Sequence, residues 1–177
     1  MSGEILHYFV EGKCEQAFIK SFVHADKGNG RFRPGKVEVF NVLYERISPT
    51  KAMLIKHGTK VVFVFDTDVK KTDVLEDNIT CLNKYANIEY KDIYFIPSVK
   101  TFEEELVFAC DSIKNINELL NTKGLEDFKN KFINHSDIVS KLYNAGFSFE
   151  KMWSRNPDKP FSDYENSSSK IKETIKT

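Results

Sequence analysis

The sequence predicts an α/β protein: a Rossmann-like, doubly wound parallel sheet of about four strands, followed by a C-terminal helical extension. Apolar runs of strand length alternate with amphipathic runs of helix length in the first two thirds of the chain. After about Gly124 only short helical patterns remain. The 177 residues, 41% of them hydrophobic, suffice for one well-packed domain. We expect the α/β domain over residues 1–123 and a helical extension and tail, packed on it, over residues 124–177.

The first half of the α/β domain contains two predicted strands and one helix. Ile5–Val10 is a continuous apolar run that ends at Glu11, as expected for a buried strand. Glu15–Ala25 has apolar residues at helical spacing, and Lys27–Gly35 is rich in turn residues and predicts a loop. Lys36–Leu43 returns to strand character.

The second half repeats the alternation. Ser48 followed by proline predicts a helix start, and that helix ends at Gly58. The strands Val61–Phe65 and Asp92–Val99 follow, separated by a helix that ends near Ala86. Two capping boxes predict the remaining helix starts: Asp73 with Glu76, and Thr101 with Glu104.

Composition limits the classes of function. Basic and acidic residues both number 26, so no overall positive charge indicates a nucleic-acid partner. No apolar run is long enough to span a membrane, and the N-terminal residues do not form a signal peptide. The three cysteines are far apart, as in reduced intracellular proteins, and we expect a cytoplasmic protein without membrane contact.

Acidic residues follow three of the four predicted strands. Glu11 follows the first, Asp66 and Asp68 follow the third, and Glu103 and Glu105 follow the fourth. Parallel strands end at one edge of the sheet, and in a 2-1-3-4 order the first and third strands are neighbours. Crowded carboxylates repel one another unless a cation lies among them, and oxygen ligands suit Mg²⁺ or Mn²⁺. The sequence therefore predicts a metal site at this edge.

The motifs FVEGKCE, VVFVFDTDV and TFEEEL, in this order, resemble the Toprim domain of topoisomerases, bacterial primases and OLD-type nucleases. The resemblance covers about residues 4 to 110. It implies that Glu11 is the family's glutamate after the first strand and that Asp66 and Asp68 are its DxD pair. Glu15 matches the second glutamate of the nuclease-type EGxTE motif, with Cys14 in place of threonine. The continuation DTDVKK lacks the glycine of topoisomerases, which favours a small stand-alone, nuclease-type protein.

The resemblance implies a Mg²⁺-dependent nuclease, or a related phosphodiester enzyme, of the kind found in phage defence or mobile elements. Asp66, Asp68 and one of Glu103 and Glu105 would hold one or two metal ions, and Glu15 is a further candidate ligand. Glu11 would be either another ligand or the general acid/base.

Candidate contacts to nucleic acid are basic residues near the acidic edge and in the tail: Lys13, Lys70, Lys71, Lys100 and Arg155. DNA rather than RNA is the expected substrate. Because the net charge is zero, we expect that tight binding of nucleic acid needs either an activating partner, such as an ATPase, or a homo-oligomer.

The sequence is also compatible with two other functions. Asp66-Thr67-Asp68-Val69 also satisfies the DxDx[TV] motif of haloacid-dehalogenase-like phosphohydrolases, in which Asp66 would be the nucleophile, Asp68 an acid/base and Ser98 a phosphate contact. That superfamily also needs a lysine and an acidic pair after a further strand, where this sequence is helical. A non-catalytic binding module, with the acids around a structural cation, is the second alternative.

Overall fold

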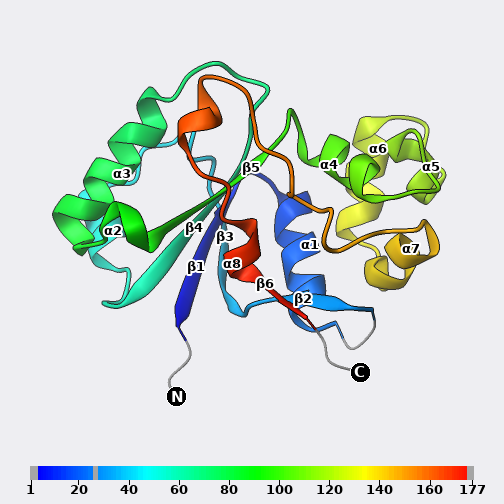
Figure 1. Cartoon of the computed structure of the whole chain (residues 1–177), viewed down its shortest axis with the longest axis horizontal. Helices are drawn as coiled ribbons and strands as arrows, with labels where there is room; N and C mark the ends of the chain where they lie inside the picture. The colour runs from blue at the N-terminus through cyan, green and yellow to red at the C-terminus, as the bar shows by residue number, and fades with distance from the viewer. Residues whose placement is uncertain (1–3, 26–27, 175–177) are drawn as a thin grey trace.

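A four-stranded parallel sheet forms the centre of the protein (Figure 1). The computed structural model describes residues 4–25 and 28–174. The strands of this sheet are β1 (Ile5–Val10), β3 (Gly35–Val39), β4 (Thr59–Asp66) and β5 (Ile93–Ser98), in the order β3-β1-β4-β5. The fold is therefore α/β and Rossmann-like, and β1 and β4 are neighbours in the middle of the sheet.

Helices cover both faces of the sheet (Figure 1). Helices α1 (Lys13–Val23) and α4 (Phe102–Ala109) pack on one face, and α2 (Pro49–Met53) and α3 (Asp73–Ala86) pack on the other. A single 3-10 turn, η1 (Tyr90–Asp92), precedes β5.

The apolar run of β4 is buried on both faces, as the second layer of helices requires. Val62 and Val64 belong to the hydrophobic core under α1 and α4. Val61, Phe63 and Phe65 belong to the core under α2 and α3. Because successive strand residues point to opposite faces, a strand covered on both sides has to be apolar throughout.

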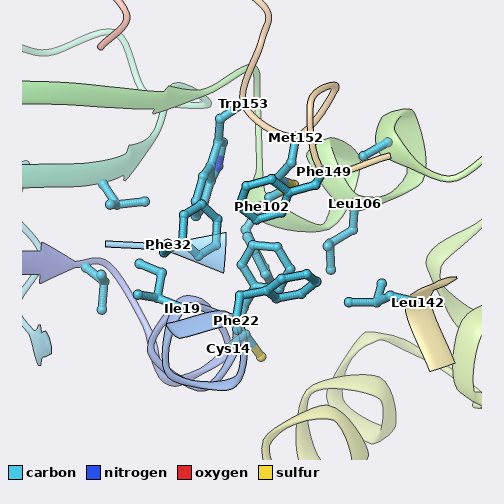
Figure 2. Close-up of a cluster of buried hydrophobic side chains, with 14 of the residues drawn as sticks. Cys14, Ile19, Phe22, Phe32, Phe102, Leu106, Leu142, Phe149, Met152 and Trp153 are labelled. Carbon is cyan, nitrogen blue, oxygen red and sulfur yellow. The ribbon is translucent and has the colours of Figure 1, made fainter. Parts of the chain in front are cut away.

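The chain after β5 packs mainly on the α1 face. Three further helices form there: α5 (Ile116–Leu120), α6 (Leu125–Ile133) and α7 (Ile138–Asn144). Phe132 and Trp153 contact Phe102, and Trp153 also lies edge-on to Phe18, with 5.6 Å between the ring centroids (Figure 2). The extension thus shares its hydrophobic core with the sheet domain.

The C-terminal segment returns to the sheet domain. It contains η2 (Phe161–Asp163), α8 (Ser168–Ile171) and β6 (Lys172–Thr174). Asn166 forms an isolated bridge with Phe95, so this segment runs along the outer edge of β5. Strand β6 pairs antiparallel with β2 (Gly30–Phe32).

Several local predictions were wrong in detail. The segment Lys27–Gly35 was expected to be a loop, but it contains β2; Lys27 itself lies outside the described residues. The N-cap of α3 is Thr72 rather than the predicted Asp73. The Thr72 hydroxyl donates a hydrogen bond of 3.0 Å to the Glu76 carboxylate. In the extension, where only short helices were expected, residues 149–153 form turns and Phe147 bridges Cys110. The caps at Ser48 and Thr101 are confirmed, because each side chain accepts a backbone N–H three residues later.

None of the helices within residues 4–25 and 28–174 has the length and apolar character needed to span a membrane.

Candidate acidic site at the carboxyl edge of the sheet

Glu11 and Asp66 meet at the ends of adjacent strands. Strand β1 pairs with β4 up to Val10 and Val64, so the residues that follow both strands emerge side by side. The backbone N–H of Asp66 donates a hydrogen bond of 3.0 Å to Oε2 of Glu11. This bond holds the Glu11 carboxylate against the end of β4.

A pocket of about 350 Å³ opens at this point, and we call it the acidic pocket. The first turns of α1 and α4 contribute Glu15 and Glu103, and α6 contributes Lys129. The pocket is lined by Glu11, Gly12, Lys13, Cys14, Glu15, Asn41, Asp66, Glu103, Lys129 and Ile133. Four of these residues are acids that come from three different strand ends, so the pocket gathers carboxyl groups that are distant in the sequence.

Among the acids of the pocket, Asp66 has the most strongly raised pKa. The residue is only 9% exposed, and its Oδ1 atom is buried without a hydrogen-bond partner. Burial, followed by the nearby charges of Glu11 and Glu15, raises the pKa of Asp66 to about 9. Among the described residues no basic side chain pairs with Asp66, so at neutral pH and without a bound cation burial holds this carboxyl in its protonated form.

The pKa values of the neighbouring acids are also raised. Burial raises the pKa of Glu15 to about 7, and the charges of Glu11 and Glu103 add to this shift. Burial also raises the pKa of Glu11, against the hydrogen bond from the Asp66 N–H. Because these carboxyl groups raise one another's pKa, each proton bound or lost affects the others.

Lys129 supplies a positive charge inside the pocket. Its Nζ lies 3.3 Å from Oε1 of Glu103, whose side chain is only 11% exposed. The Lys129 side chain is about half exposed to solvent. Cys14, the other polarisable group there, is buried, and its pKa is raised to about 12 by burial and by Glu15, so it stays a neutral thiol.

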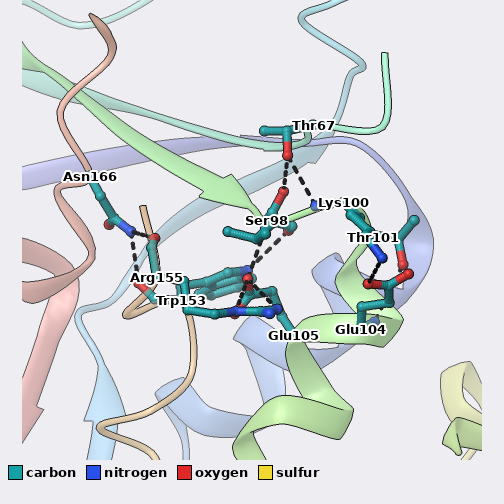
Figure 3. A network of polar contacts seen from close by, with 10 residues as sticks. Thr67, Ser98, Lys100, Thr101, Glu104, Glu105, Trp153, Arg155 and Asn166 are labelled. Atoms are coloured by element: carbon teal, nitrogen blue, oxygen red, sulfur yellow. Dashed lines mark hydrogen bonds and ion pairs between the residues drawn. The ribbon is translucent and has the colours of Figure 1, made fainter. Parts of the chain in front are cut away.

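The structure does not bring every predicted ligand into the pocket. Asp68 is exposed and lies outside the pocket lining, although its charge contributes to the raised pKa of Glu11. Glu105 is fully buried elsewhere: its Oε1 accepts from the Val99 N–H at 2.8 Å and from Nη2 of Arg155 at 3.0 Å (Figure 3). Of the two acids left open on α4, Glu103 is therefore the one that faces the pocket.

The predicted nucleic-acid contacts divide into three groups. Lys13 is exposed at the rim of the acidic pocket. Lys70 and Lys71 line a different cavity, of about 420 Å³, beside Leu43 and Tyr44. Lys100 and Arg155 line a groove along α4.

The donor set of the pocket fits a hard divalent cation, although no three Asp, Glu, His or Cys residues of the described chain already stand at metal-binding distance of one another. All four acids offer oxygen, the donor that Mg²⁺ and Mn²⁺ prefer. One buried oxygen, Oδ1 of Asp66, has no protein partner. The Glu103–Lys129 pair and the Glu11–Asp66 bond occupy two of the other carboxylates.

Sequence reasoning missed Lys129 and Asn41. Lys129 belongs to α6, and nothing in the local pattern GLEDFKNKF distinguishes it from Lys131, the other lysine of that helix. Its role depends on how α6 packs against α1, with Phe128 and Phe132 buried in the shared core.

A comparison of the chain with family models, curated proteins and solved structures finds no match. Function therefore has to be argued from the geometry of the acidic pocket.

Proposed function

We propose that this protein is a Toprim-like, Mg²⁺-dependent nuclease that hydrolyses phosphodiester bonds of nucleic acid at the acidic pocket. The observation that carries the proposal is the buried Asp66 carboxyl, with its unpartnered Oδ1, in a pocket that Glu11, Glu15 and Glu103 also line. The strand order β3-β1-β4-β5, which sets the glutamate strand beside the DxD strand, supports the Toprim-like assignment. Ionisation of this buried acid costs free energy that a bound cation would offset.

Asp66, Glu11 and Glu103 are the residues that would hold the metal, with Mg²⁺ or Mn²⁺ as the cation. Each offers a carboxylate to the same pocket. A bound divalent ion would supply an activated water and stabilise the charge that develops on the phosphoryl oxygens. Asp68, exposed beside Glu11, is open to contact through water.

The remaining residues of the pocket supply proton transfer and charge. With a pKa near 7, the Glu15 carboxyl is divided between its protonated and charged forms at neutral pH, so it can hold or release a proton at its Oε atoms. Nζ of Lys129 and the exposed Lys13 carry positive charge to a substrate phosphate at the pocket. We assign the acid/base role to Glu15 and a ligand role to Glu11, whose Oε2 is fixed by the Asp66 N–H.

The topology weighs against the haloacid-dehalogenase-like alternative. That activity needs a lysine and a further acidic pair after a parallel strand beyond β5. In the described chain the main sheet ends at β5, and Asn166 bridges its outer edge. The only later strand, β6 among the described residues, pairs with β2 in a separate sheet.

The test is a cleavage assay on plasmid, linear duplex, single-stranded DNA and RNA, with Mg²⁺, with Mn²⁺ and with EDTA. We expect metal-dependent scission that falls by about a thousandfold in Asp66→Asn and Glu11→Gln. The matched control is Asp92→Asn, an acid at the opposite end of the sheet that pairs with Lys60. This variant should cleave like the wild type.

Each other outcome identifies a different function. Hydrolysis of a small phosphomonoester that survives Glu11→Gln but not Asp66→Asn would replace the nuclease with a phosphohydrolase that uses Asp66 as nucleophile. Silence on every substrate, together with metal binding, would indicate a binding module.

A further inference from the structure

A second cavity adjoins the acidic pocket along α4, and we call it the Phe108 groove. It has a volume of about 500 Å³ and is lined by residues of β5–α4, the α4–α5 connection and Arg155. Glu103 lines both the groove and the acidic pocket, so the two cavities share a wall. A ligand that occupies the groove therefore lies against Glu103, one of the candidate metal ligands.

An exposed aromatic ring and a guanidinium form a platform in this groove. Phe108 is 41% exposed, and Cζ of Arg155 lies 4.3 Å from the centroid of its ring. Nε and Nη2 of Arg155 both donate to Oε1 of the buried Glu105, at 3.2 and 3.0 Å. Figure 3 shows this network, in which Asn166 also bonds the Arg155 carbonyl oxygen at 2.6 Å. The platform is thus fixed before any ligand binds.

Two lysines lie along the same groove: Lys114, and Lys100, whose Nζ lies 3.3 Å from Oε2 of Glu104 in an exposed ion pair. Lys100 has a positive φ of 68°, and its N–H donates to Oγ1 of Thr67 at 3.0 Å. This conformation costs energy in a residue other than glycine, and such strain concentrates at binding sites. Thr67 stands between Asp66 and Asp68, so the bond ties the start of the groove to the acidic edge. Lys114, in the connection between α4 and α5, is exposed and also lines the groove.

We propose that the Phe108 groove binds single-stranded nucleic acid, with a base stacked on Phe108 beside Arg155 and phosphates held by Lys100 and Lys114. An aromatic face next to cations is the combination that binds unpaired bases and their backbone. A base-paired duplex keeps its bases stacked inside and cannot place one on this ring. The direction of the strand, over Glu103 to the acidic pocket, rests on the proposed nuclease function.

The test is binding of a fluorescein-labelled, mixed-sequence oligodeoxynucleotide, measured by fluorescence anisotropy in EDTA so that no cleavage occurs. We expect Phe108→Ala to weaken binding about tenfold, as the loss of one base–aromatic contact does. Lys114→Ala should reduce the slope of log K against log salt by about 0.7, one phosphate contact of a single strand. Phe108 is partly exposed, so its substitution leaves the core intact.

The matched control is Tyr85→Ala. Tyr85 is 38% exposed on α3, over the other face of the sheet, and Nζ of Lys84 lies 5.0 Å from its ring centroid. It thus repeats the aromatic–cation pair outside the groove, and its loss should leave binding unchanged.

Three results would overturn the inference: no binding of the oligonucleotide, equal effects of Phe108→Ala and Tyr85→Ala, or tighter binding of the same sequence as a duplex. Cleavage assays separate this inference from the nuclease proposal. Metal-dependent scission that Phe108→Ala leaves unchanged on single strands would remove the groove and keep the nuclease. Phe108-dependent binding without scission by any variant would keep the groove and remove the nuclease.

Discussion

The two ends of the central sheet treat their acidic residues in opposite ways. At the amino end, Glu4 accepts from Nη1 of Arg33 at 2.8 Å, and Asp92 pairs with Nζ of Lys60. At the carboxyl end, Asp66 has a buried oxygen without a partner, although it is the more deeply buried acid. Both acids of the amino end thus have a cationic partner, whereas Asp66 at the carboxyl end has none among the described residues.

The contrast indicates what the carboxyl end is built to accept. Glu11, Glu15 and Asp66 all have raised pKa values there, with burial as the largest cause. Lys129 pairs with Glu103, at 3.3 Å, and leaves Oδ1 of Asp66 unpartnered. A site that gathers acids whose ionisation is unfavourable until a cation is present is suited to a positively charged ligand.

The largest expected effect on stability comes from an acid of the carboxyl end that the chain does neutralise. Arg155→Met leaves Glu105 fully buried without its cation, so we expect the free energy of unfolding to fall by about 3 kcal/mol. Arg31→Met, which breaks the exposed pair with Glu173, should cost less than about 1 kcal/mol. Urea unfolding of both variants measures the difference. Equal losses would show that the burial of Glu105 has no energetic consequence.

A matched pair of substitutions compares the two ends directly. Asp66→Asn removes a buried acid that is charged at alkaline pH and has no cationic partner among the described residues. Without divalent ions we therefore expect the free energy of unfolding to rise by about 2 kcal/mol at alkaline pH. Asp92→Asn removes a partner of Lys60 and should lower stability by less than about 1 kcal/mol. Thermal unfolding in EDTA reports both. A loss of stability in Asp66→Asn would mean that the carboxylate is neutralised after all.

Stability should depend on pH in a direction fixed by the raised pKa values. An acid whose pKa is higher in the folded state binds more protons there, so stability falls as pH rises from its unfolded to its folded pKa. For Glu15 and Asp66 this window runs from about 4 to about 7 and about 9, respectively. In EDTA the melting temperature should fall across it, and the fall should be smaller in Asp66→Asn. Because metal binding needs charged carboxylates, added Mg²⁺ should stabilise the protein more as pH increases.

The smallest expected effect concerns Lys129. Lys129→Met removes a positive charge that now pairs with Glu103 and that would repel a bound cation. We expect Mg²⁺ affinity to increase about fivefold, the effect of one screened charge at this range. Titration calorimetry of the variant measures it, with the exposed Lys131→Met of the same helix as control. Weaker binding would mean that Lys129 supports the metal site.

The strands and the meeting of Glu11 with Asp66 could be predicted from the sequence because both depend on local pattern. Apolar runs set the strands, and parallel strands bring the residues after their carboxyl ends to one edge of the sheet. The pairing of β2 with β6 could not be predicted, because the paired residues Arg31 and Glu173 are distant in the sequence and no local pattern marks them. Lys129 was missed for the same reason, since it reaches the pocket only through the packing of α6.

The acids of α4 illustrate a different limit. Glu103 and Glu105 both stand in the first helical turn, and the sequence pattern treats them alike. Residues two apart on a helix point about 200° apart, so only one can face the pocket. Which one does so depends on Arg155, from the tail, which binds Glu105. Side-chain direction at a site is thus decided by tertiary partners.

The most direct test of the central claim is to count bound Mn²⁺ by the loss of the free-ion signal in electron paramagnetic resonance at mildly alkaline pH. The wild type and Asp92→Asn should bind Mn²⁺, and Mg²⁺ should compete with it. Asp66→Asn should lose that binding. Equal binding by all three proteins, or none by the wild type, would contradict a metal site at the carboxyl end of the sheet.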